Sequence, residues 1–401
     1  MARSTQPGPR STIDDVVEIG EVEPFSQVDD VFSRSMWDEA VATEEASRFF
    51  ATYRRPLDTW RRAKGFTQRD YALRNASWHV ADVFAEMFQD DDRRDGFLDP
   101  LSMLRDSATE RVDLGDEVAA AGHVKHAAKL FGADDVGITE NDPRWVYSDR
   151  FSATTGGPKP NDIGDGLDHV VVIAQRMDEG LIETAPSALA GAATGLGYSK
   201  DAAVLLGMAQ FIRNLGYRAV PSMNDTALAI PLAISAGLGE YARNGLVIHP
   251  EFGPSFRIGK IFTDLPLAHD APIDTGVARF CDSCTRCADA CPASAIPHGR
   301  PTADPLNRSS IRGVTKWSVD GEACFGYWTK INSDCAVCIR VCPYTRGDGR
   351  QDRIWRRVAG SRARRLASWW HDRTDGGKRR RSDDWWGSAP TPVEISPKPQ
   401  S

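Results

Sequence analysis

The eight cysteines of this 401-residue chain carry its clearest chemical signal, because all of them lie between positions 281 and 342. Disulfide frameworks are typical of small secreted chains, whereas thiols gathered in one window of a large protein indicate a metal site. The first four follow the C-x2-C-x2-C-x3-C-P spacing of bacterial ferredoxins, in which three thiolates bind one [4Fe–4S] cluster and the fourth binds another. These residues are Cys281, Cys284, Cys287 and Cys291.

A second motif supplies the ligands that the first one lacks. Cys335, Cys338 and Cys342 form a C-x2-C-x3-C-P run, and Cys324 stands eleven residues before it. Two zinc sites are the alternative, but they would not require this spacing. We therefore expect one [4Fe–4S] cluster on Cys281, Cys284, Cys287 and Cys342, and the other on Cys291, Cys324, Cys335 and Cys338.

Two clusters in series conduct electrons without binding an organic substrate, so the electrons need an acceptor elsewhere. The 280 residues before Cys281 are too many for a ferredoxin and should hold a cofactor or substrate pocket. The GLG at 195–197 lacks the spacing of a dinucleotide-binding loop, which disfavours a flavin or nicotinamide partner. A different low-potential acceptor is required.

Hydrophobic periodicity predicts the elements that must position this chemistry. Helical patterns cover 36–53, 71–88, 117–131 and 200–215, and strand patterns cover 135–138, 169–174, 219–221, 246–248 and 257–262. Alternating helices and strands predict a sheet covered by helices. Trp145 and Tyr147, in the RWVY segment, either shape a pocket in this region or fill its core.

Charge and composition favour a globular protein that does not bind nucleic acid. The 49 Lys and Arg against 56 Asp and Glu leave a net charge of −7, which gives no overall electrostatic footprint for nucleic acid. The start of the chain has no apolar signal-peptide core and no twin-arginine pair, and its longest uncharged runs are too short to span a bilayer. We therefore expect a cytoplasmic protein without a membrane anchor.

Several stretches together resemble the reductive dehalogenases, the corrinoid iron–sulfur enzymes that replace carbon–halogen bonds by carbon–hydrogen bonds. The main stretch is NDTALAIPLAISAGLGEYARNGLVIHPEFGPSFRIGKIFTDLPL (224–267), followed by the double ferredoxin motif. Upstream, the same order holds for GADDVGITENDPRWVYS (132–148) and GYSKDAAVLLGMAQFIRNLGYRAVPSMND (197–225), and GGKRRRSDDWW (376–386) resembles the family's C-terminal end. The resemblance covers roughly residues 116–387. It implies an α+β protein with a nitroreductase-like corrinoid-binding α/β core and an appended double-cluster ferredoxin-like module.

Combined with composition, the resemblance predicts five regions. They are a flexible acidic N-terminal segment (1–35), a helical N-terminal region (36–115), the corrinoid- and substrate-binding core (116–270), the ferredoxin-like domain with two [4Fe–4S] clusters (271–350), and a basic, tryptophan-containing C-terminal extension with a disordered end (351–401). The last region carries twelve Lys and Arg against six Asp and Glu. Its basic run at 378–381 is either a solvated arm or a docking site for an acidic electron carrier.

The resemblance also implies three catalytic residues. The family's tyrosine falls on Tyr198 in GYSK, its asparagine on Asn224 in PSMND and its arginine on Arg257 in PSFRIGK. Reductive dehalogenation needs a proton as well as electrons. A tyrosine beside a cation gives up its proton more readily, so Tyr198 with Arg257 forms a coherent general-acid pair, while Asn224 orients the phenol or the substrate.

The leading hypothesis is a reductive dehalogenase that binds a cobalamin-type corrinoid and reduces a small organohalide. An external low-potential ferredoxin or flavodoxin would supply its electrons, because no reductase domain is recognisable in the chain. Two alternatives stay open: a related corrinoid iron–sulfur reductase similar to the epoxyqueuosine reductases, and a non-catalytic iron–sulfur electron carrier.

Overall fold

A four-stranded antiparallel sheet forms the centre of the computed structural model, which describes residues 12–54, 63–86, 95–347, 349–374 and 377–388. The strand order is β1-β4-β8-β5. β4 (His169–Arg176) and β8 (Phe256–Thr263) are central, with β1 (Asp135–Glu140) and β5 (Ala219–Ser222) at the edges. The apolar run of β4 is explained by this position, since Val170–Ala174 is buried on both faces of the sheet.

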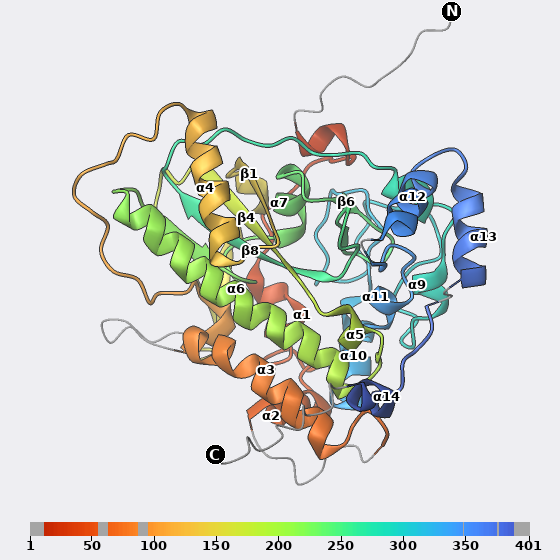
Figure 1. Ribbon diagram of the computed structural model, residues 1–401. Helices are drawn as coiled ribbons and strands as arrows, with labels where there is room; N and C mark the ends of the chain where they lie inside the picture. Colours follow the sequence, from red (N-terminus) through yellow and green to blue (C-terminus); the bar gives the residue numbers. More distant parts are fainter. Residues whose placement is uncertain (1–11, 55–62, 87–94, 348, 375–376, 389–401) are drawn as a thin grey trace, which may run out of the picture.

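Helices cover one face of the sheet and a mixed layer covers the other (Figure 1). Val171, Ile173 and Ile261 pack into a core with α4 (Glu117–Phe131), α6 (Ala188–Asn214) and α3 (Gln68–Glu86). Val170, Val172 and Phe262 point to the opposite face, where α7 (Ala229–Ser235) packs. The α+β class expected from the sequence is therefore confirmed. One difference is that 246–248 joins a separate pair, β6 (Glu240–Tyr241) with β7 (Val247–Ile248).

The long helix α6 organises the layer that carries the candidate tyrosine. It begins at Ala188, because the Ser187 hydroxyl caps it by accepting a hydrogen bond from the Ala190 backbone N–H. The amphipathic pattern of the sequence predicts a later start, at residue 200. Its first half is rich in alanine and glycine and is buried nearly all round, so no amphipathic stripe marks it. Gly195 lets α3 approach closely: a Cβ there would stand 2.2 Å from the Ser77 hydroxyl and 2.5 Å from Trp78 Cδ1.

The N-terminal residues are packed against the rest of the protein, which corrects the expectation of a loose segment for 12–35. Three short helices form there: η1 (Ile13–Asp15), η2 (Gln27–Asp29) and α1 (Val31–Arg34). Their acidic residues act as helix caps and ion-pair partners: Asp30 caps α1, and Arg144 binds Asp14. Residues 1–11 of the predicted flexible segment lie outside the described residues.

The predicted helix at 36–53 is shorter in the structure. α2 spans Glu44–Arg54, because the Thr43 hydroxyl accepts a hydrogen bond from the Ala46 backbone N–H and sets the start of the helix. α2 packs on α10 (Gly321–Ile331) through clustered aromatic rings, Phe49 and Phe325 among them. The N-terminal helices and the cysteine-containing region are thus in direct contact.

Short helices and loops make up the cysteine-containing region, and a helical hairpin packs on one side of it (Figure 1). The short helices are α8 (Val277–Cys281), α9 (Arg286–Asp289) and α11 (Val337–Arg340), and the hairpin is α12 (Arg350–Ala359) with α13 (Arg364–Thr374). The remaining elements are η3 (Gly96–Leu98), η4 (Pro143–Trp145), β2 (Asp149–Ser152), β3 (Gly157–Pro160), α5 (Glu179–Ile182) and α14 (Ser382–Gly387). Within the described ranges, no helix combines the length and the apolar character needed to cross a membrane.

The close approach of α3 to α6 yields a stability prediction. Gly195→Ala should destabilise the protein by about 1–3 kcal/mol, because the added methyl group overlaps Ser77 and Trp78. Gly122→Ala is the matched control, since Gly122 is an exposed glycine of α4 and an added methyl group there would have no atom within 4 Å. That change should leave Tm unchanged or raise it. Thermal unfolding followed by circular dichroism under anaerobic conditions measures both, and equal Tm values would contradict the steric argument.

Candidate active site and redox centres

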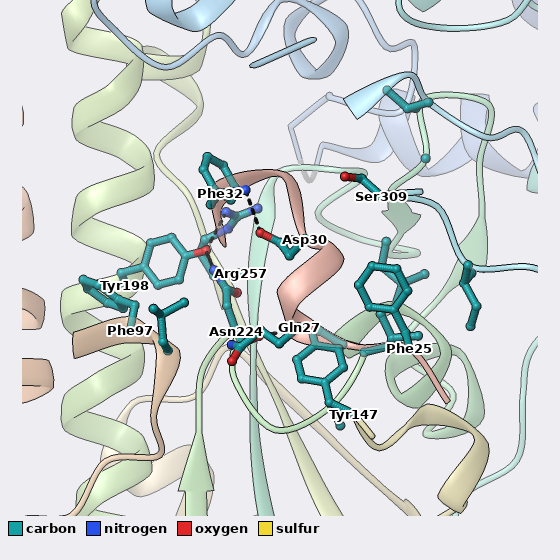
Figure 2. Close-up of a pocket in the computed structure, with 18 of the residues that line it drawn as sticks. Phe25, Gln27, Asp30, Phe32, Phe97, Tyr147, Tyr198, Asn224, Arg257 and Ser309 are labelled. Atoms are coloured by element: carbon teal, nitrogen blue, oxygen red, sulfur yellow. Dashed lines mark hydrogen bonds between the residues drawn. The ribbon is translucent and has the colours of Figure 1, made fainter. Parts of the chain in front are cut away.

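Tyr198 lies at the meeting point of α6, the loop after β5 and the start of β8. Its hydroxyl oxygen accepts hydrogen bonds from Asn224 Nδ2 at 2.5 Å and from the Arg257 guanidinium at 3.3 Å. Figure 2 shows the three side chains converging on one wall of a cavity. β5 and β8 are antiparallel neighbours, with Ser222 opposite Lys260, so the segment that follows β5 meets the start of β8 at the same end of the sheet.

This arrangement sets the direction of the phenolic proton. A tyrosine hydroxyl has one O–H donor and two acceptor lone pairs. Asn224 and Arg257 occupy the acceptor side, so the O–H of Tyr198 is left to donate to whatever binds in the cavity. Both neighbours are donors and one is a cation, and both interactions become stronger when the oxygen carries negative charge.

Aromatic rings hold the phenol in place. Trp78 stacks on Tyr198 with ring centroids 4.9 Å apart, and Phe97 meets it edge to face at 5.9 Å. Tyr147 donates a hydrogen bond to the Asn224 carbonyl at 3.3 Å, which steadies the amide that faces Tyr198. Burial raises the pKa of Tyr147, and the nearby carboxylates of Asp30 and Asp225 raise it further, so Tyr147 is kept protonated.

The cavity in front of Tyr198 has a volume of about 1250 Å³. Its wall is mostly aromatic and apolar, and it combines core residues with residues of the N-terminal helices (Figure 2). Trp145 and Tyr147 are both in the wall, as are Asp30, Phe32 and Phe97. Because pockets for drug-sized ligands measure about 300–1,000 Å³, this volume accommodates a macrocyclic cofactor with a small molecule beside it.

A glycine on each of α6 and β8 makes room for a charged side chain from the other element. A Cβ on Gly197 of α6 would lie 2.7 Å from Arg257 Cγ, so the stem of Arg257 crosses α6 where a side chain is missing. A Cβ on Gly259 of β8 would lie 2.5 Å from the Asp201 carboxylate, which occupies that space from α6. Asp201 is fully buried, and neither of its carboxylate oxygens has a hydrogen-bond partner within the described residues. Burial raises its pKa to about 7, against the opposing pull of the Lys260 and Arg257 charges.

The cysteines of the two motifs lie close enough to one another to affect each other's pKa. Burial raises the pKa of Cys281 to about 12, with Cys284 and Cys287 close enough to raise it further. Burial also raises the pKa of Cys342, and the neighbours that add to this rise are Cys281, Cys287 and Cys284. Burial raises the pKa of Cys324 to about 12, and Cys335 and Cys291 add to this rise. Burial also raises the pKa of Cys338, to which Cys324, Cys335, Cys287 and Cys291 add.

These thiols suit iron–sulfur clusters as a donor set. All eight are free of disulfide bonds. Burial raises the pKa, and so disfavours the ionised form, of the thiols of Cys281, Cys284, Cys287, Cys324, Cys335, Cys338 and Cys342. Thiolates buried in this way need a compensating positive charge, which bound iron supplies. The cysteines pack toward two different parts of the protein. Cys281, Cys284 and Cys342 pack toward the α12–α13 hairpin. Cys287, Cys291, Cys335 and Cys338 pack toward α5 and α6.

Asp334 links the second cysteine group to the cavity. It precedes Cys335 in the chain and is also part of the cavity wall. Its carboxylate accepts a hydrogen bond from the Tyr53 hydroxyl and lies 3.8 Å from the guanidinium of Arg74, which is completely buried. Arg74 in turn stacks over the Tyr53 ring at 3.6 Å. The wall between the second group and the cavity is therefore a polar and aromatic layer built partly by α2 and α3.

Comparison with known proteins identifies both halves of this arrangement. Residues 166–267 match the family described as reductive dehalogenase subunit, and residues 280–345 match the 4Fe-4S double cluster binding domain. Tyr198, Asn224 and Arg257 lie within the first match, and all eight cysteines lie within the second. Over these residues the chain is thus similar to the reductive dehalogenases.

The similarity extends over a large part of this chain. It is 35% identical over 261 residues to the tetrachloroethene reductive dehalogenase of Sulfurospirillum multivorans, covering 59% of this chain and 52% of that protein. It is 37% identical over 265 residues to the tetrachloroethene reductive dehalogenase of Dehalobacter restrictus, covering 57% of this chain and 48% of that one. The chain thus spans about half the length of the curated reductive dehalogenases that it matches.

A solved reductive dehalogenase shares the fold. The catabolic reductive dehalogenase in complex with 3-bromo-4-hydroxybenzoic acid superposes with a TM-score of 0.70 at 24% identity, covering 94% of this chain and 49% of that one. This agreement supports the expected architecture of a mixed helix–sheet core with a C-terminal double-cluster module. At 24% identity, this superposition shows a shared fold alone.

Arg243 is a site residue that the sequence analysis did not identify. It is 2% exposed and lies in the turn between β6 and β7. Its guanidinium donates hydrogen bonds to five backbone carbonyls, those of Cys281, Asp282, Cys284, Pro297 and Gly299. Within the described ranges it forms no ion pair. Its positive charge therefore faces the first cysteine loop without a neutralising carboxylate.

Asp201 gives a prediction for the pH dependence of stability. Below pH about 4 its carboxyl is protonated in the folded and the unfolded chain alike. Between pH about 4 and 7 the unfolded chain ionises while the folded chain keeps the proton, so the stability contribution of this group falls as pH rises. The amide of Asp201→Asn does not titrate. Its free energy of unfolding should therefore rise relative to wild type between pH 5 and 7.5, with a limiting slope of about 1.4 kcal/mol per pH unit, and its Tm should rise with it.

Glu140→Gln serves as the control for this measurement, because Glu140 is an exposed carboxylate at the end of β1. Its Tm difference from wild type should stay constant over the same pH range. A Tm difference for Asp201→Asn that is also independent of pH would show that Asp201 is ionised throughout.

Proposed function

We propose that this chain is a corrinoid-dependent reductive dehalogenase in which Tyr198 donates the proton to the carbon that loses its halogen. The observation that carries the proposal is the paired donation of Asn224 and Arg257 to the Tyr198 oxygen at the wall of a large cavity. The same wall adjoins the second cysteine group through Asp334. Both observations support a proton donor and a route for electrons at the same cavity.

The cavity fits the cofactor that this reaction needs. A bound corrinoid supplies the cobalt at which the carbon–halogen bond is reduced. The volume of about 1250 Å³ and the mostly apolar wall suit a macrocycle with a small halogenated molecule beside it. The residues that would hold this pair are the aromatic wall of Trp145, Tyr147 and Phe97 and the polar cluster around Tyr198.

The overall reaction consumes two electrons and one proton for each halide released. Tyr198 gives up its phenolic proton, and the resulting phenolate keeps the hydrogen bonds of Asn224 and Arg257. Because one of these donors is a cation, the negative charge on the oxygen is stabilised as it forms. Trp78 and Phe97 keep the ring from turning, so the proton is delivered in one direction.

The order of the cysteine groups supports electron delivery from outside the chain. The group of Cys281, Cys284, Cys287 and Cys342 would bind the first [4Fe–4S] cluster, beneath the surface hairpin. The group of Cys291, Cys324, Cys335 and Cys338 would bind the second, beside the cavity. An external low-potential carrier of the ferredoxin or flavodoxin type would then act as the electron donor, and a small organohalide as the substrate.

Tyr198→Phe is the direct test of the proton donor. Halide release from the corrinoid-loaded enzyme should fall by about 100-fold or more, because the ring packing remains and only the proton is lost. Iron and cobalt contents should match those of wild type. Tyr217→Phe is the matched control, since its hydroxyl bonds the Val112 carbonyl away from the cavity and its loss should leave halide release within about twofold. Undiminished halide release by Tyr198→Phe would remove Tyr198 from the mechanism.

Metal content separates an enzyme from a carrier. Protein produced anaerobically with corrinoid should contain about eight iron atoms and one cobalt per chain, as two [4Fe–4S] clusters and one corrinoid require. Plasma emission spectrometry measures both metals on the same sample. Eight iron atoms without cobalt would favour a non-catalytic electron carrier. Cobalt without halide release from aryl and alkenyl halides would favour a corrinoid reductase with another substrate.

A further inference from the structure

The α12–α13 hairpin is a strongly basic surface element of the protein. Residues 350–374 contain eight arginines and only two acidic residues, Asp352 and Asp372. Both acids are engaged in ion pairs: Asp352 binds Arg346 at 2.9 Å, and Asp372 binds Arg286 of the first cysteine run. The outer side of the hairpin is thus positive in a chain whose net charge is −7.

The exposed faces of the two helices combine this charge with apolar side chains. On α12 the outward stripe is Arg350, Arg353, Ile354 and Arg357, at helical spacing. Beside and along α13 the corresponding stripe is Arg362, Leu366, Trp369 and Arg373. Ile354, Leu366 and Trp369 are 42%, 64% and 56% exposed. Large apolar side chains surrounded by charge are typical of a surface that meets a partner.

The inner face of the same hairpin covers the first cysteine group. Trp355, Ala359 and Ala367 are buried in one cluster with Phe280 and Tyr344, and the thiols of Cys281, Cys284 and Cys342 pack against this cluster. Trp355 is fully buried, and its indole N–H donates to the Ala367 carbonyl at 2.8 Å, which ties the two helices together. Only one helical layer, about 10–12 Å thick, therefore separates the basic surface from the first cysteine group.

The other basic segment, 378–381, is bound to the body of the protein. Arg379 donates to the carbonyls of Thr184 and Pro186, and the Arg380 backbone N–H donates to the Glu183 carbonyl. Trp386 donates to Asp70 at 2.8 Å, so the adjoining α14 is docked as well. Of the two basic segments, the hairpin is the one that presents arginines and apolar residues together at the surface.

We propose that the outer face of α12 and α13 is the docking surface for a small acidic one-electron carrier that reduces the first cluster. The carrier gives one electron and is oxidised, and the cluster bound by Cys281, Cys284, Cys287 and Cys342 accepts it. This surface is the point at which electrons for the proposed function enter the protein. The proposal rests on that function only because it requires an external electron donor. Positive arginines attract an acidic carrier over a distance, and Ile354, Leu366 and Trp369 provide the close contact.

An acidic protein fits this surface better than a lipid membrane does. Basic helices with exposed tryptophan and leucine also bind anionic bilayers. Membrane binding, however, does not require a position directly above the redox centre, whereas an electron carrier must come close to that centre to transfer an electron. The hairpin is the layer that lies over the first cysteine group, so its charge is placed where a carrier must arrive.

Stopped-flow reduction of the holoenzyme by a purified reduced flavodoxin tests the proposal. The variant is Arg357→Glu with Arg365→Glu, two exposed arginines on the hairpin. Arg105→Glu with Lys64→Glu makes the same change of charge at exposed positions outside the hairpin and is the matched control. Cluster absorbance, iron content and halide release driven by reduced methyl viologen are recorded for each protein, so that folding and chemistry are checked separately.

The hairpin variant should lower the second-order rate of cluster reduction at low salt by about 10-fold or more, and this difference should shrink at high ionic strength. The control variant should stay within about twofold of wild type. Equal rates for wild type and the hairpin variant would overturn the proposal. A second outcome would also overturn the proposal and would favour a membrane as the partner. In that outcome, wild type binds vesicles of phosphatidylglycerol and phosphatidylcholine, the hairpin variant does not bind them, and flavodoxin reduces both proteins at the same rate. Because the readout is cluster reduction, failure of halide release alone would count against the proposed function and not against the docking surface.

Discussion

The close packing of α6 against both β8 and α3 is the constraint on which the candidate active site depends. Gly195 and Gly197 lie on nearly opposite faces of α6 and have no side chain to fill the space there. The space at Gly195 is taken by Ser77 and Trp78, and the space at Gly197 by the stem of Arg257. Tyr198 follows directly and receives its stacking partner from α3 and its cationic partner from β8. A bulkier residue at either glycine would separate the phenol from one of the groups that orient it.

The cysteine arrangement could be predicted because its information is local. Two short motifs with fixed spacing predict the exchange of Cys291 and Cys342 between groups, and the structure brings the cysteines of both motifs into one region. The cluster of Tyr198, Asn224 and Arg257 is different. Asn224 and Arg257 stand 26 and 59 residues from Tyr198, on elements whose meeting depends on sheet register, so only a family resemblance predicts that the three belong together.

Other features could not be recognised from the sequence for physical reasons. The first half of α6 has no polar face, because it is buried nearly all round, so its pattern does not reveal a helix before residue 200. The acidic N-terminal residues suggest a solvated segment, yet several of them cap helices or pair with arginines. Asp201 and Arg243 look like ordinary surface charges in the sequence. Their burial becomes apparent only when Gly259 and the cysteine loop are placed beside them.

The five carbonyls around Arg243 bear on the mechanics of the protein. The guanidinium ties both sides of the first cysteine run, at Cys281–Cys284 and at Pro297–Gly299, to a turn that follows the core helix α7. A hinge motion between the cysteine region and the core would break the hydrogen bonds between these carbonyls and the buried Arg243 guanidinium. Leaving a buried cation without partners costs free energy in a medium of low dielectric constant. The cysteine region and the core are therefore held as one rigid body. The separation between the electron entry point and the cavity is a constant of the fold, unlike in proteins whose electron-transfer domains swing between partners.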